Sequence, residues 1–306
     1  MFTGSLLFRD MRAIVWHGPG RVALERREVP SPGPGQVLVK VLFNGLCSTD
    51  YPIVEGQVAG SWPGMVLGHE PVGVVVALGE GVVRPGVGDR VVLDTMIACG
   101  SCRFCRQGHT ELCAHSDEIG FTLDGNWSDY ATLPAANLHV LRDDIGDLGG
   151  RRIADSAGAV HTMRSAPQVR ADEGFDVVID AVGTQETTLA ALSLARRGGR
   201  VLLYGLRSAV IDRFPLGQAI FRNLTLLGRT SAPWMWGPAM DLVARGAVRL
   251  RPMIGEVIAL EDVPALLIGQ RGHGGPLKRI VRVAGKEEGG DGGDGWKGGE
   301  GDVCRS

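Results

Sequence analysis

Residues 99–113 read Cys99-Gly-Ser-Cys102-Arg-Phe-Cys105-Arg-Gln-Gly-His-Thr-Glu-Leu-Cys113, which places four cysteines within fifteen positions of a 306-residue chain. Two-residue gaps let the first three thiolates surround one point, and the longer arm to Cys113 closes a tetrahedron. Tetrahedral thiolate coordination selects zinc, or less often iron, and leaves no open position. The stretch therefore predicts a structural Zn²⁺ site formed by Cys99, Cys102, Cys105 and Cys113.

Two alternative roles for these cysteines are less favoured. Disulfides would allow three connectivities, but disulfide frameworks belong to short secreted chains, and residues 1–10 do not read as a secretory signal. A nucleic-acid-binding zinc ribbon needs a basic chain, and the formal net charge is −2. We therefore expect a cytoplasmic protein without a nucleic-acid partner. No apolar run is long enough to span a bilayer, so no membrane partner is expected.

The chain changes pattern near its middle. Residues 11–142 contain short Val-rich runs separated by Pro and Gly, which predicts strands over 12–16, 36–43, 72–78 and 89–93 in a barrel-like or sandwich domain. From Phe175 onward, continuous apolar strands (175–182, 198–205 and 224–228) alternate with a helical pattern over 186–195. That alternation predicts a parallel sheet. Residues 285–306 include nine glycines and predict a disordered tail.

A second group of ligand-type residues lies near the start of the β-rich part. Cys47-Ser-Thr-Asp50 follows one strand, and Gly68-His69-Glu70 precedes another. A thiolate, an imidazole and a carboxylate from separated loops are typical ligands of an open, catalytic Zn²⁺. Such a metal lowers the pKa of an alcohol oxygen, and the Thr49 hydroxyl can pass the proton on. Each of the two segments alone is weak evidence for a catalytic zinc. Their occurrence in the same chain as the four-cysteine motif strengthens that prediction.

These motifs resemble those of the zinc-dependent medium-chain alcohol dehydrogenase family. The similarity covers residues 11–283 and includes Gly45–Asp50, Gly68–Gly73, Pro85–Val91 and Gly125–Ala131, as well as the cysteines. The resemblance implies an α/β protein with a β-rich domain: a GroES-like barrel over 11–146 with 248–284, and a Rossmann-type parallel sheet over 147–247. It also implies zinc chemistry with NAD or NADP and an alcohol or polyol substrate, and the protein is expected to form a homo-oligomer.

The resemblance carries roles to individual residues. Cys47 and His69 become ligands of the catalytic zinc, and Glu70 becomes either an interchangeable ligand or a residue just behind the ligands. Thr49 begins a proton relay, and Asp50 supports the zinc-binding loop. A relay histidine of the family falls at Pro52 here. Three aromatic residues, Tyr51, Trp62 and Phe121, would face the substrate. Strand ends and two late cations would contact the cofactor: Val182, Gly183, Tyr204, Gly205, Gly228, Arg229, Thr230, Lys278 and Arg279.

One expected feature is missing from the sequence. A G-x-G-x-x-G turn should join a strand to a helix before Phe175. The three matches to that spacing, at 18–23, 290–295 and 293–298, lie in a barrel turn and in the tail. Only 28 residues separate Gly146 from Phe175, whereas two strand–helix units and a linker need upward of ~45. About 50 residues present in relatives are therefore predicted to be absent, so the Rossmann sheet is truncated.

Two functions remain open from the sequence alone. The first is a dehydrogenase that moves hydride between a secondary alcohol or polyol and a nicotinamide cofactor, with activity reduced because the phosphate-binding turn is absent. The alternative is a catalytically inactive zinc-binding remnant that acts only as a structural or interaction protein. The shared ancestry does not decide between them, and binding of NADH would discriminate.

Overall fold

The computed structural model describes residues 10–141, 173–205, 210–229, 233–248, 250, 253–269 and 278–284. The chain divides into two compact units, one formed by Met1–Ala157 with Pro233–Ser306 and the other by Gly158–Ala232. The fold is mixed α/β, as predicted, with a β-rich unit and a unit built on a parallel sheet. The domain boundaries predicted from the sequence stay a prediction. The disordered tail predicted over 285–306 lies outside the described residues.

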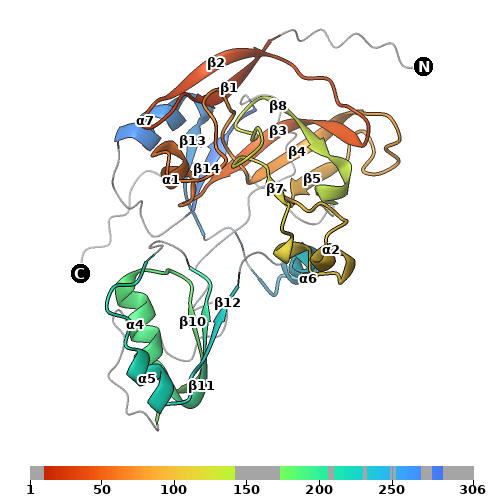
Figure 1. Ribbon diagram of the computed structural model, residues 1–306. Helices are drawn as coiled ribbons and strands as arrows, with labels where there is room; N and C mark the ends of the chain where they lie inside the picture. Colours follow the sequence, from red (N-terminus) through yellow and green to blue (C-terminus); the bar gives the residue numbers. More distant parts are fainter. Residues whose placement is uncertain are drawn as a thin grey trace. The chain divides into compact units, whose positions relative to one another are not determined.

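A seven-stranded sheet forms the centre of the β-rich unit. Its strand order is β13-β14-β3-β4-β5-β9, with β8 also paired to β3. The strands are β3 (Gln36–Leu46), β4 (Pro71–Leu78), β5 (Arg90–Leu93), β8 (Tyr130–Pro134), β9 (Leu138–Val140), β13 (Ile254–Ala259) and β14 (Lys278–Arg282). Figure 1 shows the blue C-terminal strands among the red and orange strands of the N-terminal part. The strands predicted at 36–43, 72–78 and 89–93 are therefore confirmed.

Smaller elements complete this unit. Two hairpins, β1 (Asp10–Trp16) with β2 (Val22–Glu28) and β6 (Met96–Ile97) with β7 (Asp117–Glu118), form separate two-stranded sheets. The helices are α1 (Asp50–Val54), α2 (Arg103–Arg106), α6 (Trp236–Ala244) and α7 (Val263–Gly269). Short 3-10 turns lie at Thr110–Leu112, Ala135–Asn137, Pro233–Met235 and Leu260–Asp262. In the part of the chain that the structure describes, no helix is long and apolar enough to cross a membrane.

The core of the β-rich unit comes from alternating strand residues. Val37, Val39 and Val41 on β3 are at most 1% exposed. They belong to one large cluster with Ile14, Trp127 and residues of α7 and β14. Branched apolar side chains at every second position of a strand bury one face of the sheet, which is what the Val-rich runs predicted. This cluster fixes the loops that carry the candidate sites.

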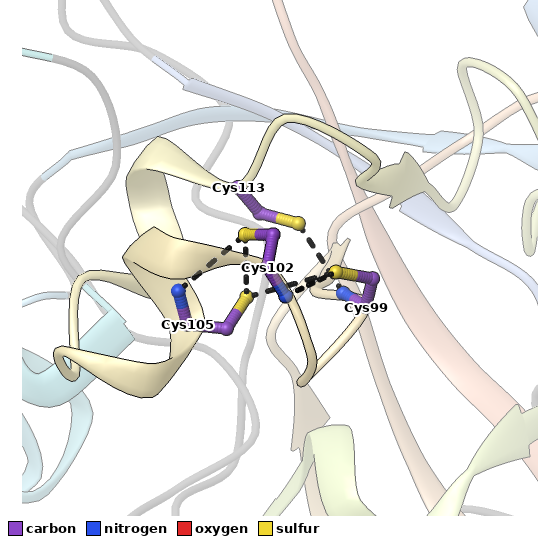
Figure 2. A group of neighbouring side chains, drawn as sticks. All are labelled: Cys99, Cys102, Cys105 and Cys113. Atoms are coloured by element: carbon purple, nitrogen blue, oxygen red, sulfur yellow. Dashed lines mark hydrogen bonds between the residues drawn. The ribbon is translucent and has the colours of Figure 1, made fainter.

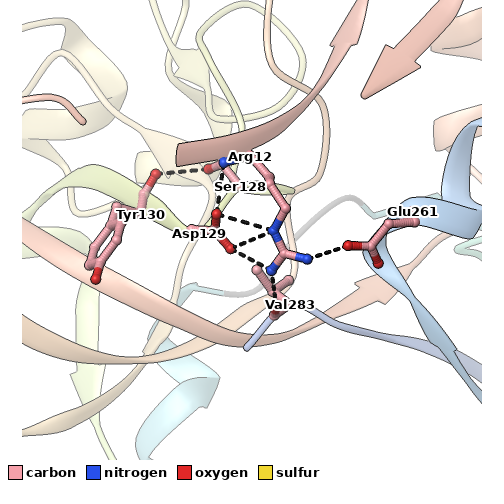
Figure 3. A network of polar contacts seen from close by, with 6 residues as sticks. All are labelled: Arg12, Ser128, Asp129, Tyr130, Glu261 and Val283. Atoms are coloured by element: carbon pink, nitrogen blue, oxygen red, sulfur yellow. Dashed lines mark hydrogen bonds and ion pairs between the residues drawn. The ribbon is translucent and has the colours of Figure 1, made fainter. Parts of the chain in front are cut away.

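An ion-pair network ties the first strand to distant parts of the same unit (Figure 3). The Arg12 guanidinium donates from Nη2 to Asp129 Oδ1 at 2.7 Å and to the Val283 carbonyl at 2.6 Å. The same side chain pairs with Glu261, and its backbone N–H donates to Asp129 Oδ2 at 2.7 Å. Next to it, Ser128 Oγ donates to the Tyr130 carbonyl at 2.8 Å. The planar five-donor guanidinium suits such convergence of acceptors.

The second unit contains a three-stranded parallel sheet. Its order is β10 (Phe175–Asp180), β11 (Ala195–Leu203) and β12 (Thr225–Gly228), with helices α4 (Gln185–Leu194) and α5 (Leu216–Phe221). The Thr184 hydroxyl caps α4 by accepting the Thr187 N–H, and Arg222 donates to the Ala195 carbonyl at 2.6 Å beyond the helix. The predicted strand–helix alternation is confirmed. The strand predicted to begin at Gly198 begins earlier, at Ala195.

Candidate functional site

The four-cysteine segment forms a small lobe on the β6–β7 hairpin. Cys99 follows β6, Cys102 caps α2, Cys105 lies within α2, and Cys113 ends the 3-10 turn before β7. Among the described residues the cysteines form no disulfide. Cys102 is the N-cap residue of α2, and its sulfur accepts a hydrogen bond from the Cys105 N–H. A sulfur can take this place because it accepts a main-chain N–H as the usual N-cap oxygen does.

The sulfurs of the lobe are spaced as a metal would require (Figure 2). All four lie within 4.8 Å of one another, with Cys99–Cys105 at 4.0 Å and Cys102–Cys105 at 3.5 Å. A tetrahedron with Zn–S bonds of about 2.3 Å has edges of about 3.8 Å, whereas a disulfide bond is about 2.05 Å long. The geometry therefore fits a closed zinc site and excludes a disulfide pair in this structure.

Main-chain N–H groups surround these sulfurs. Cys113 Sγ accepts from Cys99 N at 3.3 Å, and Cys99 Sγ accepts from Cys102 N at 3.4 Å. Hydrogen bonds from the Ser101 backbone and hydroxyl lower the pKa of Cys99 to about 6. Burial, followed by hydrogen bonding to Cys102 and Cys113, raises the pKa of Cys105 to about 12. The lobe favours thiolates but crowds them, and a divalent cation relieves that repulsion.

The structure also brings the second predicted group together. Cys47 Sγ, a His69 ring nitrogen and a Glu70 carboxylate oxygen lie within 4.8 Å of one another. Cys47 leaves β3 just before α1, and His69-Glu70 leads into β4. Gly68 has a φ of +94°, and an added Cβ would lie 2.6 Å from Trp127 Cγ, so the turn before His69 requires glycine. Two neighbouring strands therefore deliver the three ligand atoms.

His69 is buried between a hydroxyl and a carboxylate. Its Nε2 lies 3.3 Å from Thr49 Oγ1, and its Nδ1 lies 3.3 Å from Asp50 Oδ1, an ion-pair contact that is not aligned as a hydrogen bond. Asp50 Oδ2 accepts the Cys47 N–H at 2.7 Å. Burial lowers the pKa of His69, but the charge and polar contact of Asp50, together with the contacts of Cys47 and Glu70, outweigh burial and raise the pKa to about 10. Asp50 therefore orients Nδ1 and leaves Nε2 for a metal.

Glu70 has a partner that the sequence did not reveal. Lys278 Nζ lies 2.7 Å from Glu70 Oε1 and 2.5 Å from Oε2, across 208 positions of the chain. The pair lies over Gly45, where an added Cβ would fall 1.8 Å from Glu70 Oε2. Lys278 was predicted to meet the cofactor, and that role stays a prediction. Arg279 donates to Glu256 at 3.0 Å.

One of the three predicted substrate-facing aromatics lies against the site. The Phe121 ring is 4.8 Å from the His69 ring, tilted by 55°. Trp62 is 43% exposed, and its Nε1 donates weakly to the Thr122 carbonyl at 3.4 Å. Tyr51, like Phe121, packs against the main core cluster. Phe121 therefore borders His69 of the candidate metal site, and Trp62 is available to solvent or ligand.

Six predicted cofactor residues gather at the carboxyl ends of the parallel strands. The N–H groups of Tyr204 and Gly205 donate to the Asp180 carbonyl, at 3.0 and 2.9 Å, so β10 and β11 end side by side. The N–H groups of Val182 and Gly183 donate to Asp180 Oδ1 at 3.0 and 2.9 Å. Gly228 pairs with Leu203, and Arg229 follows it. Thr230 lies outside the described residues. This strand edge is where open α/β sheets bind ligands.

Family comparisons agree with both parts of the chain. The alcohol dehydrogenase GroES-like domain matches residues 33–143, and the zinc-binding dehydrogenase domain matches residues 147–245. The first match contains Cys47, His69, Glu70 and the four-cysteine lobe. The second contains the parallel strands.

Individual relatives extend this similarity. A sorbitol dehydrogenase of Halalkalibacterium halodurans is 34% identical over 199 residues, 64% of this chain and 57% of the relative. The chain spans about half the length of the first curated relatives it matches. A cobalt- and zinc-bound thermostable alcohol dehydrogenase of Pyrobaculum aerophilum superimposes with a TM-score of 0.76, at 25% identity, over 89% of this chain and 99% of that one.

A longer match supports the predicted internal shortening. An L-threonine 3-dehydrogenase of Pyrococcus horikoshii is 29% identical over 317 positions, covering 80% of this chain and 90% of the relative. The alignment is longer than the 306-residue chain, although only part of the chain takes part. Tens of residues of the relative therefore have no counterpart here.

Proposed function

Because the chain belongs to the zinc-dependent medium-chain dehydrogenase family, we propose that it is a cytoplasmic oxidoreductase for a secondary alcohol or polyol. It would transfer hydride to NAD or NADP and hold one structural and one catalytic zinc. Sorbitol and L-threonine, for which two of the relatives are named, both carry secondary hydroxyl groups. We further propose that the cofactor binds weakly, so turnover is low.

The convergence of Cys47, His69 and Glu70 carries this proposal. A sulfur, a nitrogen and an oxygen within 4.8 Å form the mixed donor set of catalytic zinc rather than the all-thiolate set of the lobe. Asp50 behind His69 is the carboxylate that typically orients a ligating imidazole. The donors therefore fit zinc, and the ion pair with Lys278 competes with the metal for the Glu70 carboxylate.

Zinc bound there would supply Lewis-acid polarisation of the substrate oxygen. The chain's own residues do the remaining work. Thr49 Oγ1, exposed and 3.3 Å from His69 Nε2, is placed to accept the hydroxyl proton and pass it to water or the cofactor ribose. Pro52 offers no proton-carrying group. Phe121 limits water at the His69 ring and orients an apolar part of the substrate.

Weak cofactor binding follows from the sequence of the second unit. Family members bind pyrophosphate on N–H groups of a glycine turn at a helix N-terminus. Of the N–H groups at the described strand ends, those of Val182 and Gly183 already donate to Asp180, and those of Tyr204 and Gly205 donate to its carbonyl. The Arg229 N–H likewise donates to the Leu203 carbonyl at 3.1 Å, so these five N–H groups are not available to the cofactor.

The alternative is a zinc-binding protein without turnover. It is favoured by the absence of a fingerprint turn between Gly146 and Phe175. Hydride transfer needs two reactants held in alignment, which is worth ~7–11 kcal/mol of the barrier. A loosely held cofactor loses much of this contribution to the rate. The two proposals therefore differ in how tightly the cofactor is held, and a measurement of cofactor binding separates them.

The test is a fluorescence titration with NADH and NADPH, joined to an oxidation assay on sorbitol, L-threonine and simple secondary alcohols. We expect no saturation at sub-millimolar cofactor, and slow oxidation that disappears in Cys47→Ser. Ser48→Ala, in the same loop and exposed, is the matched control and should keep the wild-type rate. Micromolar cofactor binding with ordinary turnover would refute the impairment, whereas zero oxidation at saturating cofactor would favour the zinc-binding remnant.

A further inference from the structure

Two buried asparagines lie beside the catalytic-type ligands. Asn44 is 1% exposed on the central strand β3, where it pairs with Val281 of β14 and Pro71 of β4. Asn126 is fully buried in the loop before β8. Burying an amide among apolar side chains costs stability unless its donors and acceptor are paired. Both residues therefore need a physical reason for their position.

Asn44 links the two segments that meet at His69. Its Oδ1 accepts the Glu70 N–H at 3.0 Å. Its Nδ2 donates to the Asn126 carbonyl at 2.9 Å and to Asn126 Oδ1 at 2.5 Å. Only this orientation of the amide satisfies all three contacts, because the Glu70 N–H needs an acceptor and the two Asn126 oxygens need a donor.

The asparagines hold the peptide groups on both sides of His69. The Asn126 N–H donates to the Gly68 carbonyl at 3.0 Å, on the N-terminal side. On the C-terminal side, Asn44 holds the Glu70 N–H, and the Gly45 N–H donates to the Glu70 carbonyl at 3.0 Å. Fixing both flanking peptides fixes the direction in which the imidazole leaves the backbone.

The hydrogen bonds between the two asparagines leave one buried N–H donor group without an acceptor in the described part of the chain. Among the described residues, Asn126 Nδ2 has no hydrogen-bond partner although it is buried. A purely structural role would favour an apolar side chain of similar volume, since an unpaired buried donor destabilises the fold. Local violations of this kind concentrate at functional sites.

We infer that Asn44 and Asn126 are positioning residues that fix the His69 imidazole for metal binding. The inference rests on the proposed catalytic zinc site and adds residues outside its ligand set. They touch no reacting atom and act through the backbone of residues 68–70. Partners of this kind, one step behind a ligand, affect metal affinity by about 10–100-fold.

The test uses Co²⁺ on the full chain, after elemental analysis has shown that the four-cysteine lobe keeps its zinc. Absorption of the thiolate–cobalt complex reports binding at Cys47 and His69. We expect Asn44→Leu to weaken Co²⁺ binding by about 10–100-fold and to alter the spectrum. Asn126→Ala keeps the main-chain carbonyl that accepts from Asn44, so we expect a smaller loss of about tenfold. If Asn44→Leu does not fold, Asn126→Ala still tests the inference.

Asn137→Leu is the matched control. Asn137 Nδ2 donates to the Asp94 and Met96 carbonyls at 3.0 and 2.7 Å in the same unit, away from residues 68–70 in its hydrogen bonding. It should lower the unfolding midpoint but leave Co²⁺ affinity unchanged. A folded Asn44→Leu with the wild-type affinity and spectrum would overturn the inference, as would an equal loss of affinity in Asn137→Leu.

The two proposals fail differently. If the wild-type protein takes no Co²⁺ at Cys47 and His69, the proposed catalytic site is wrong. The positioning role is then judged in metal-free protein by the ¹⁵N shifts of the His69 imidazole. Asn44→Leu should move or broaden those signals and Asn137→Leu should not, and unchanged signals in Asn44→Leu would reject the role.

Discussion

The β-rich unit and the parallel-sheet unit use similar apolar strands with different results. On β3, Val37, Val39 and Val41 are at most 1% exposed. On β10, Phe175, Val177 and Ile179 are 52–60% exposed, although Val178 between them packs toward α4. A strand of a parallel sheet is apolar on both faces because both are normally covered. In the described residues of the second unit only one face is covered, as expected for a sheet that has lost neighbouring elements.

Of the changes considered, removal of the lobe zinc should have the largest effect on stability. That effect should be confined to the β-rich unit. Both ligand groups found among the described residues belong to that unit. Binding of structural zinc is worth about 10–16 kcal/mol in zinc-finger peptides, so Cys105→Ser should unfold the lobe. Hydrogen exchange should accelerate over residues 94–118 and stay unchanged over β10–β12.

The corresponding metal analysis is simple. Wild-type protein dialysed against a mild chelator should keep about one zinc per chain, while the second, catalytic-type site is only partly occupied. Complete loss of zinc with unchanged exchange in the lobe would show that the metal is not part of its folding.

A matched pair of isoleucines tests the difference in covering. Ile14 is fully buried in the β-rich unit, and Ile179 is 60% exposed on β10. Ile14→Ala should lower the free energy of unfolding by about 2–5 kcal/mol. Ile179→Ala should change that of its own unit by no more than about 0.5 kcal/mol. Denaturant unfolding followed by hydrogen exchange gives both values. A comparable cost at Ile179 would mean that this face of β10 is covered in solution.

The Arg12 network tests how much polar contacts, in addition to the apolar core, stabilise the β-rich unit. Replacing Arg12 by Met keeps the aliphatic stem but leaves Asp129 without its guanidinium partner. A hydrogen bond to a charged group is worth about 1.5–3 kcal/mol, and we expect a loss in that range for the β-rich unit. Arg26→Met, at an exposed position of β2, is the control and should change the denaturant midpoint little. Equal midpoints in the two variants would assign the network no net contribution.

The smallest effect is expected from acid on the second unit. Burial raises the pKa of Asp180, but hydrogen bonds from the Gly183 N–H and the Thr188 hydroxyl outweigh burial and lower it. Its stabilising contribution is therefore complete above the unfolded-state pKa of about 3.9 and is lost as the pH falls below that value. The urea midpoint of this unit should drop between pH 6 and pH 3, and less so in Asp180→Asn. An equal drop in both would place the acid sensitivity elsewhere.

Local patterns predicted much of the fold. The Val-rich runs predicted β1, β3, β4 and β5 to within a few residues, because alternation and flanking Gly and Pro are local signals. The spacing of the cysteines predicted their convergence for the same reason. Cys47, His69 and Glu70 gave weaker signals, since the loops that carry them are separated in sequence, and the four cysteines and the family resemblance were needed to give those signals weight.

Contacts between distant segments could not be predicted from the chain. Nothing near Lys278 indicates Glu70, because strand register brings β14 beside β3 only in the folded sheet. The one local signal for Asn44 was a polar residue in a mostly apolar strand that also carries Gln36 and Lys40, which does not identify its partner. The sequence predicted a truncated parallel sheet, but it did not indicate that one face of β10 would be exposed.

The pairing of β14 with β3 sets an order of events during synthesis. Val281 pairs with Asn44, and all of the parallel-sheet unit lies between them in the chain. The ribosome therefore synthesises the whole second unit before it synthesises β14, the strand that carries Lys278. Until then β3 lacks one neighbour along residues 43–46, and Glu70 lacks its cation. Closing so long a loop is slow, so the nascent chain spends that interval with an open sheet edge beside its candidate metal ligands.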